Sequence, residues 1–354
     1  MNFRYYALRG MLLGSAENRS LGEVIGKRIV FREAGKVEIE EFPLRKPEAN
    51  EVLVETVCTL ISPGTETAFL MALPNTPKRF PRYPGYSNVG VIASKGSESS
   101  ELAVGDRVAS RKSHASHVIV DETEVLKIPN NLSFEEASFF ALGSISLQAV
   151  RKAHIEIGES VVVLGQGLVG NLALQLAKLS GGMPLVAVDM FDYRLEISKR
   201  CGADYTFNPK RDSLIEEVNR VTEGKGADVV IEATGNPKAI PTALKLAGRC
   251  GRVILLGSTR GTSEVNFYSE VHRKGVTIIG AHESIRPRYD SIHGWWTQKD
   301  DSILVLKLLS KGLLRVKDLI SAKMSYRDAA KAYDLLINSK ENTLGIVLEW
   351  KEDQ

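Results

Sequence analysis

The segment that links two short apolar runs, from Val161 to Asp189, has the residue pattern of a dinucleotide-binding turn. Three glycines with the spacing G-x-G-x-x-G, Gly165, Gly167 and Gly170, follow the first run and open an apolar helical stretch. The first glycine allows a tight turn, the second lets backbone approach a pyrophosphate, and the third lets helix and strand pack closely. The helix N-terminus adds free N–H groups for the phosphates. The segment therefore predicts a dinucleotide site.

Asp189 indicates which dinucleotide binds. It ends the second apolar run, Leu185–Val188, and lies 19 residues after Gly170, close to the roughly twenty of the dinucleotide fingerprint. A carboxylate at this point accepts hydrogen bonds from both ribose hydroxyls and repels a 2′-phosphate. We therefore expect NAD and not NADP. A related domain that binds another adenine ligand, such as a methyl donor, is the alternative.

Composition limits the class of protein. The chain has 354 residues, of which 43% are hydrophobic and 25% charged, which suits two globular domains. A net charge of +3 gives no basic footprint for nucleic acid, and no apolar run is long enough for a bilayer. The three cysteines are far apart, which predicts a reducing, cytoplasmic location. Residues 1–26 show no repeating pattern and are expected to form a poorly structured extension.

Two kinds of pattern divide the rest of the chain. Residues 27–143 show short β-runs separated by Gly and Pro, which is typical of a partly open β-barrel. Residues 144–281 alternate apolar runs with helical stretches, which predicts an α/β domain with a doubly wound parallel sheet. We expect two later helices, Ser302–Lys311 and Asp328–Ile337, and a last strand, Leu344–Trp350.

The last strand determines the domain organisation. An apolar strand at the end of a chain needs a sheet to join, and the N-terminal β-domain is the obvious host. The first domain is therefore expected to be discontinuous, built from residues 27–143 and 282–354 around the domain of residues 144–281.

This organisation resembles the medium-chain dehydrogenase/reductase superfamily over about Lys27 to Trp350. The motifs that carry the resemblance are short and follow in order: Gly105-Asp106-Arg107-Val108, the glycine turn, Gly202-Ala203-Asp204, Glu232-Ala233-Thr234-Gly235, Gly251-Arg252-Val253 and Lys274-Gly275-Val276. The resemblance implies a GroES-like β-domain, a Rossmann domain, and hydride transfer between NAD and a carbon bearing an alcohol or carbonyl, in the cleft between domains.

The resemblance also extends the cofactor site. Arg194, five residues past Asp189, matches the basic residue that packs near the adenosine ribose, and His282 follows the last Rossmann strand, where the chain usually runs near the nicotinamide. The full set of expected cofactor-binding residues is Gly165, Gln166, Gly167, Leu168, Val169, Gly170, Asp189, Arg194, Thr234, Gly257 and His282.

The chain departs from the zinc-using members of that superfamily. Ser62, Tyr86 and Ala141 stand where those members have Cys, His and Cys or Glu, and this trio is not a zinc-binding set. The structural-zinc lobe is missing too, because only Ala109–His114 separates Val108 from the next strand. We expect a zinc-free enzyme. The Ser62 and Tyr86 segments resemble a branch that includes bacteriochlorophyllide dehydrogenases and sugar-linked bi-domain oxidoreductases.

Without zinc, other groups must stabilise charge on the substrate oxygen. Tyr86 is the expected donor, because it replaces a metal ligand; Thr65 lies near the family's proton-relay hydroxyl, and Glu66 is a potential general base. The structural alternatives are that Tyr86 only packs, Thr65 caps a turn after Pro63-Gly64, and Glu66 is a solvated carboxylate.

For several other polar residues, a surface role is the alternative to a functional role. His114 and His117 border a strand and are expected at the surface. Five residues after the last Rossmann strand form either the wall of a polar pocket or a surface loop: Arg286, Arg288, Trp295, Trp296 and Lys299.

The main functional hypothesis is an NAD-dependent, metal-independent dehydrogenase acting on a secondary alcohol of a sugar, polyol or cyclitol. An enoyl or quinone reductase is a second reading, although such relatives mostly use NADPH, against which Asp189 argues. A non-catalytic NAD-binding protein is a third. The partners expected are a small alcohol or carbonyl substrate and further copies of the chain in a dimer or tetramer.

Overall fold

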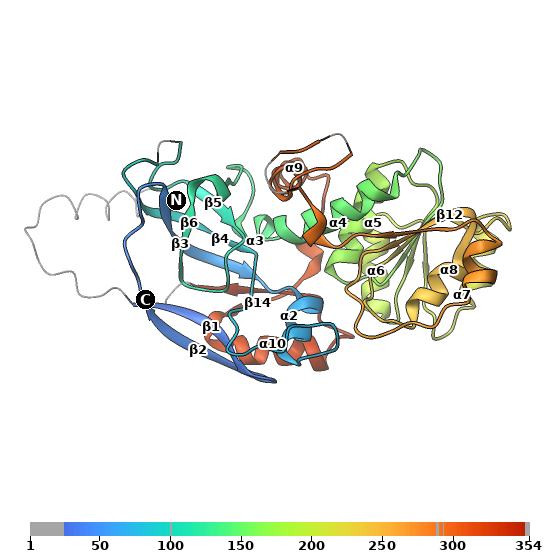
Figure 1. The fold of residues 1–354 in the computed structure, drawn as a ribbon, viewed down its shortest axis with the longest axis horizontal. Helices are drawn as coiled ribbons and strands as arrows, with labels where there is room; N and C mark the ends of the chain where they lie inside the picture. Colours follow the sequence, from blue (N-terminus) through green and yellow to red (C-terminus); the bar gives the residue numbers. More distant parts are fainter. Residues whose placement is uncertain (1–24, 100, 288–289, 293, 351–354) are drawn as a thin grey trace, which may run out of the picture.

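The computed structural model describes residues 25–99, 101–287, 290–292 and 294–350. The expected N-terminal extension therefore lies outside the described residues, except for Ile25 and Gly26, which begin the first strand. Figure 1 shows a β-rich domain at one end of the long axis and an α/β domain at the other. Within the described ranges, no helix has the length and apolar character needed to cross a membrane.

The first domain is built on a seven-stranded, mostly antiparallel sheet with the order β14-β15-β3-β4-β5-β7, and β6 pairs with β3. A separate antiparallel pair, β1 (Ile25–Glu33) and β2 (Lys36–Pro43), lies beside it. The sheet strands are β3 (Glu51–Leu60), β4 (Asn88–Lys95), β5 (Arg107–Ser110), β6 (His117–Asp121), β7 (Leu126–Lys127), β14 (Ile320–Ser325) and β15 (Gly345–Glu349). This is the expected GroES-like domain.

The C-terminal strand joins the N-terminal sheet, as its apolar sequence predicted. β15 pairs antiparallel with β3, with Val347 opposite Leu60, and both residues are buried. The discontinuity of the first domain follows directly from this pairing. The parallel partner of β15, strand β14, was not predicted, because its sequence, ISAKMS, lacks an apolar run.

The second domain is the predicted doubly wound sheet. Its six strands are all parallel and have the order β10-β9-β8-β11-β12-β13, which reverses direction between β8 and β11. The strands are β8 (Val161–Leu164), β9 (Leu185–Val188), β10 (Tyr205–Phe207), β11 (Ala227–Glu232), β12 (Ala247–Leu255) and β13 (Thr277–Gly280). The helices are α5 (Leu168–Leu179), α6 (Asp192–Arg200), α7 (Leu214–Val221) and α8 (Ala239–Leu246). Such sheets bind ligands at the carboxyl ends of their strands, beside the reversal.

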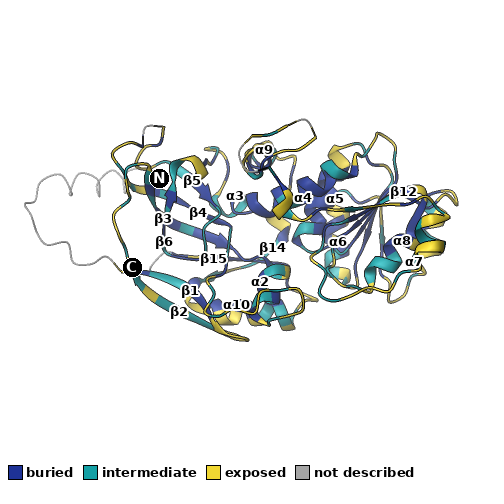
Figure 2. Ribbon diagram, in the orientation of Figure 1, coloured by how far each residue is buried: buried dark blue, intermediate teal, exposed yellow. Residues whose placement is uncertain are grey.

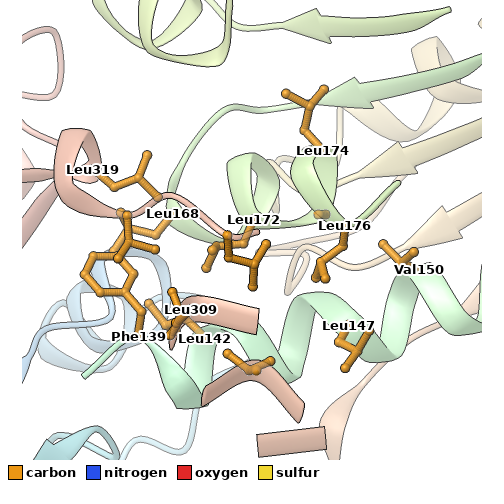
Figure 3. Packing of buried hydrophobic residues seen from close by; sticks show 14 of the residues in the cluster. Phe139, Leu142, Leu147, Val150, Leu168, Leu172, Leu174, Leu176, Leu309 and Leu319 are labelled. Carbon is orange, nitrogen blue, oxygen red and sulfur yellow. The ribbon is translucent and has the colours of Figure 1, made fainter. Parts of the chain in front are cut away.

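One long helix crosses the expected domain boundary. α4 (Phe140–Ala153) packs against α5 and against α9 (Gln298–Ser310). Figure 3 shows Leu142 and Leu147 of α4 facing Leu172 and Leu176 of α5. Figure 2 shows that this junction is mostly buried. The boundary predicted between residues 143 and 144 therefore falls inside a helix, so the two domains share one core.

Local structure differs from expectation at three helices. Residues 63–70 form α2 (Pro63–Leu70) and not a turn, because Pro fits the first helical turn, where its missing N–H is not needed. α9 begins four residues before the expected Ser302, capped by Thr297. The helix expected over Asp328–Ile337 is α10 (Ala329–Asn338). It is preceded by the short turn η5 (Tyr326–Asp328), which Ser325 caps. The remaining short helices are η1 (Glu122–Glu124), α3 (Phe134–Ala137), η2 (Tyr268–His272), η3 (Glu283–Ile285) and η4 (Lys317–Leu319).

Candidate active site

The glycine turn between β8 and α5 has the geometry that its sequence predicted. Gly165 has a φ of +87°, and a Cβ on Gly170 would lie 1.8 Å from the Gly165 carbonyl oxygen. A Cβ on Gly167 would instead meet no atom within 4 Å, so this side of the turn is open. Gly167 precedes the first turn of α5, where Leu168 and Val169 lie. The open side and the helix N-terminus together suit a pyrophosphate.

Asp189 is tied to this turn by direct hydrogen bonds. Its Oδ2 accepts from the Gln166 backbone N–H at 2.7 Å, and its Oδ1 accepts from the Phe191 N–H at 3.0 Å. A carboxylate offers about four acceptor sites, so two remain for ribose hydroxyls. The side chain of Gln166 is fully buried and donates to the Val163 carbonyl, so its role is structural.

One cation lies near the Asp189 carboxylate, and a second lies near the ring of Phe191. Arg194 Nη1 is 3.8 Å from Asp189 Oδ2, and the Arg194 guanidinium lies 5.0 Å from the centre of the Phe191 ring. Lys210 Nζ is 5.2 Å from the same ring centre. Burial lowers the pKa of Arg194, opposed by the Asp189 charge. Arg194 therefore lies beside Asp189, and its packing near the adenosine ribose stays a prediction.

The remaining cofactor predictions lie at the carboxyl ends of β11, β12 and β13. Thr234 donates through its N–H and its hydroxyl to the buried Glu232 carboxylate. A Cβ on Gly257 would lie 2.4 Å from the Gly235 nitrogen, so a glycine is required where these two loops meet. His282 is exposed, and its Nδ1 accepts from the Ser284 N–H at 3.2 Å. All three residues share the sheet edge that carries the glycine turn.

Two of the positions that hold zinc in the related enzymes contact each other through hydroxyl groups. The Tyr86 hydroxyl donates to Ser62 Oγ at 2.5 Å. The third, Ala141, is buried in α4. Burial, aided by the negative charges of Glu66 and Glu283, raises the pKa of Tyr86 to about 12, although the Ser62 and Thr65 hydroxyls act to lower it. Tyr86 therefore stays protonated at neutral pH and can donate a hydrogen bond.

Glu66 belongs to a buried network behind this pair. Its Oε1 accepts from the Ser62 N–H at 2.7 Å, and its Oε2 accepts from the Tyr333 hydroxyl at 2.5 Å. His114 Nε2 lies 2.8 Å from the same Oε2. Glu66 and His114 are 1% and 0% exposed, so the solvated-carboxylate alternative and the surface role for His114 are both wrong. His114 is buried because Glu66 gives its ring a partner.

Within this network, Glu66 fixes the position of Ser62 by accepting a hydrogen bond from its backbone N–H. Both of its oxygens have partners within the described residues, so its general-base role stays a prediction. Thr65 is half-buried, and a hydrogen bond with its hydroxyl lowers the pKa of Tyr86. Its position therefore fits the relay role expected for it, and that role also stays a prediction.

An ion pair beside Tyr86 was not predicted from sequence. Arg111 follows β5, and its Nη1 lies 2.8 Å from Glu283 Oε1 in η3. The charges of Glu283 and Tyr86 oppose the burial that lowers the pKa of Arg111. No short motif links these residues, which are far apart in the chain. The only available signal was the missing zinc lobe, which brings Arg111 directly to the end of β5.

The residues expected to form either a pocket wall or a surface loop after the last Rossmann strand have separate environments. Arg286 is buried, donates to Ser144, and lies 3.3 Å from Asp301 Oδ2. Trp295 and Trp296 are 43% and 40% exposed, which favours the surface-loop alternative for both. The others are Lys299, which donates to the Thr123 carbonyl, and Arg288, which lies outside the described residues.

Contacts from the first domain reach the Rossmann domain near the site. Asn75 Nδ2 donates to the Thr259 carbonyl at 2.9 Å, and Arg260 donates back to the Asn75 carbonyl at 3.2 Å. Arg260 is close enough to Tyr86 for their charges to interact. A cavity of about 470 Å³ lies elsewhere, beside β14, and none of the predicted site residues lines it. The fold and the glycine turn thus define a two-domain dinucleotide-dependent oxidoreductase.

Comparisons with known proteins agree with this class. Residues 169–293 match the family described as "Zinc-binding dehydrogenase". The chain is 29% identical to D-guloside 3-dehydrogenase of Escherichia coli K12 over 69% of this chain and 71% of that protein. It is 27% identical to L-threonine 3-dehydrogenase of Pyrococcus abyssi, over 88% and 95%. A short chain alcohol dehydrogenase of Escherichia coli CFT073, solved with NADH, superposes with a TM-score of 0.79 at 21% identity, covering 93% of this chain and all of that one.

The chain is thus similar to the zinc-binding dehydrogenase family, of medium-chain, alcohol-dehydrogenase type. It is an oxidoreductase acting on CH–OH groups, with NAD(P) as cofactor.

Proposed function

We propose that this protein is an NAD-dependent oxidoreductase that interconverts a secondary alcohol and a ketone of a sugar, polyol or cyclitol without catalytic zinc. The hydrogen bond from the Gln166 N–H to Asp189 is the observation that carries the choice of cofactor, because it fixes a negative charge beside the phosphate-binding turn. The sugar or polyol class is supported by D-guloside 3-dehydrogenase among the relatives.

In this proposal the bound nicotinamide supplies or accepts the hydride, and the chain supplies hydrogen bonds to the reacting oxygen. Tyr86 donates to that oxygen, since its raised pKa keeps it protonated. Without substrate, Tyr86 donates this proton to Ser62 Oγ, 2.5 Å away. When a carbonyl oxygen is bound, the Tyr86 hydroxyl turns to it, and the Ser62 hydroxyl donates to the Tyr86 oxygen in return. During alcohol oxidation the substrate hydroxyl passes its proton to Tyr86 while Tyr86 passes its own proton to the Ser62 or Thr65 hydroxyl, and the half-exposed Thr65 releases a proton to solvent. Glu66 positions Ser62 in this route by accepting from its backbone N–H.

The cofactor preference is tested with Asp189→Asn. The amide keeps an acceptor for the Gln166 N–H but removes the charge that repels a 2′-phosphate, so the turn is retained. Titrations with NADH and NADPH should show at least a tenfold preference for NADH in the wild type, about 1.4 kcal/mol, and most of it should vanish in the variant. Asp192→Asn, on the exposed side of α6, is the matched control. Equal or tighter NADPH binding by the wild type would reject the proposal.

The zinc-free mechanism is tested by metal analysis. The side chains at the three zinc positions are a hydroxyl, a phenol and a methyl group, and none is a usual zinc ligand. Within the described ranges no three His, Cys, Asp or Glu side chains gather in a way that could hold a metal. Purified protein should contain far less than one zinc per chain and keep its activity in a chelator. One tightly held zinc per chain contradicts this expectation.

We also propose that the chain forms a homodimer through the edge strand β13. Thr277, Ile278 and Gly280 of this strand are exposed, and an unpaired edge can pair with a second copy. Two large exposed side chains, Phe267 and Tyr268, are 64% and 65% accessible. Sedimentation should give a dimer for the wild type and a monomer for Ile278→Lys. A monomeric wild type at micromolar concentration is the contrary result.

A further inference from the structure

Arg111 is fixed at one end only. Its Nη1 is paired with Glu283 Oε1 at 2.8 Å, and its guanidinium carbon lies 5.9 Å from the centre of the Phe140 ring. The side chain is 20% exposed. It is close enough to Tyr86 for the charges of the two groups to interact. The guanidinium is thus held in one orientation next to the expected donor to the reacting oxygen.

The other edge of this guanidinium finds no acceptor among the described residues. Nε and Nη2 of Arg111 are both buried, and neither has a hydrogen-bond partner among the described residues. These two N–H groups are parallel and point the same way, which is the arrangement that binds both oxygens of a carboxylate. Buried donors without acceptors are unfavourable, so this edge is suited to an oxygen-bearing ligand.

The surrounding charges leave one positive charge in excess. Asp301 is shared by Arg151 at 2.9 Å and Arg286 at 3.3 Å, and Glu283 is paired with Arg111. Three guanidinium groups therefore face two carboxylates in this described cluster. Near Tyr86, Arg260 adds one cation and the buried Glu66 carboxylate adds one anion, so the excess is unchanged. A ligand with a single negative charge would balance the cluster.

We propose that the free edge of Arg111 binds a carboxylate of the substrate, so that the preferred substrates are acidic sugar derivatives such as aldonates or uronates. One carboxylate oxygen accepts from Nε and the other from Nη2, while a secondary hydroxyl of the same molecule lies at Tyr86. The single excess charge of the cluster favours a carboxylate over a phosphate dianion. This inference rests on the proposed function, because it names the substrate class of that same site.

Binding to the NADH complex tests the inference without turnover. Aldonates are titrated against alditols of the same configuration, such as D-gluconate against D-glucitol and D-galactonate against D-galactitol. Each pair differs only in a carboxylate at one carbon. At least one aldonate should bind tenfold more tightly than its alditol. If no aldonate binds better than its partner, the inference is wrong.

Variants at neighbouring positions locate the preference. Arg111→Gln should abolish it, and Arg111→Lys should keep only part of it, because an ammonium lacks the two parallel donors. Lys112→Gln is the matched control, because it removes one positive charge from the neighbouring residue. The Lys112 side chain is half-exposed and is paired with Glu124. NADH affinity should stay within twofold in all three variants. A preference that survives in Arg111→Gln overturns the assignment.

Turnover separates this inference from the proposed function. Arg111→Gln should raise KM for an aldonate at least tenfold and leave kcat for the alditol within threefold. If Arg111→Gln lowered kcat equally for the aldonate and for the alditol, Arg111 would act on the reacting oxygen, which contradicts the inference. Tighter binding of sugar phosphates than of aldonates, lost in Arg111→Gln, would contradict it too. If NADH binds but no alcohol is oxidised, the proposed function fails while the binding titrations still decide the role of Arg111.

Discussion

Replacing Tyr86 by Phe should lower kcat by about 100- to 1000-fold, while the affinity for NADH changes by less than twofold. A single hydrogen-bond donor to a developing oxyanion contributes about 2.7–4 kcal/mol, and without zinc Tyr86 is the expected donor. The substitution removes only the hydroxyl that donates to Ser62, so the ring still packs against the core. Steady-state kinetics and NADH titration measure the two effects separately.

A control for this variant is available three residues away. Tyr83→Phe removes a hydroxyl that bonds Arg28 at an exposed position, so it should leave kcat within twofold. Because the pKa of Tyr86 is raised to about 12, the wild type should show no loss of activity from Tyr86 ionisation well below that pH. Unchanged turnover in Tyr86→Phe would remove the residue from the mechanism and leave it a packing role.

Gly167→Ala should weaken NADH binding at least tenfold, about 1.4 kcal/mol or more, without lowering the melting temperature by more than about 2 °C. A Cβ at Gly167 meets no protein atom within 4 Å, and the backbone there has a negative φ, so the fold tolerates it. The new methyl group instead enters the space expected for the pyrophosphate. Fluorescence titration of NADH and a thermal melt distinguish the two consequences.

Gly64→Ala is the matched control for the glycine turn. A Cβ at Gly64 also meets nothing within 4 Å, but Gly64 lies in α2, in the first domain. Its NADH affinity should equal that of the wild type. If Gly167→Ala bound NADH normally, the open side of the turn would not be the phosphate site.

The fold was largely predictable because its signals are local. Three signals were enough: the glycine spacing, the apolar run of β8 and the apolar strand β15. Each predicts the element it packs against or pairs with, because its periodicity or its apolar face requires such a partner. Strand β14 was not predicted, because it is stabilised by its pairing with β15 and its sequence has no apolar run of its own. The helix at Pro63 was missed because Pro and Gly are read as turn residues when the first helical turn also accepts them.

The polar site was less predictable, because its partners are distant in the chain. Glu66 bonds Tyr333 and lies beside His114, and Arg111 pairs with Glu283. Each pair joins separate elements, and no periodicity relates their positions. A histidine bordering a strand looks like a surface residue until its buried carboxylate partner is known. The place of Asp189 beside the glycine turn was predictable because it depends on one local strand-end position, while its contact with the ribose stays a prediction.

The pairing of β15 with β3 has a consequence for biosynthesis. β15, which β3 needs on one side, is translated after every strand of the parallel sheet, and those strands lie in one continuous stretch. Domains generally fold as units during synthesis. The nucleotide-binding half can thus fold while β3 still lacks its partner β15 on one side.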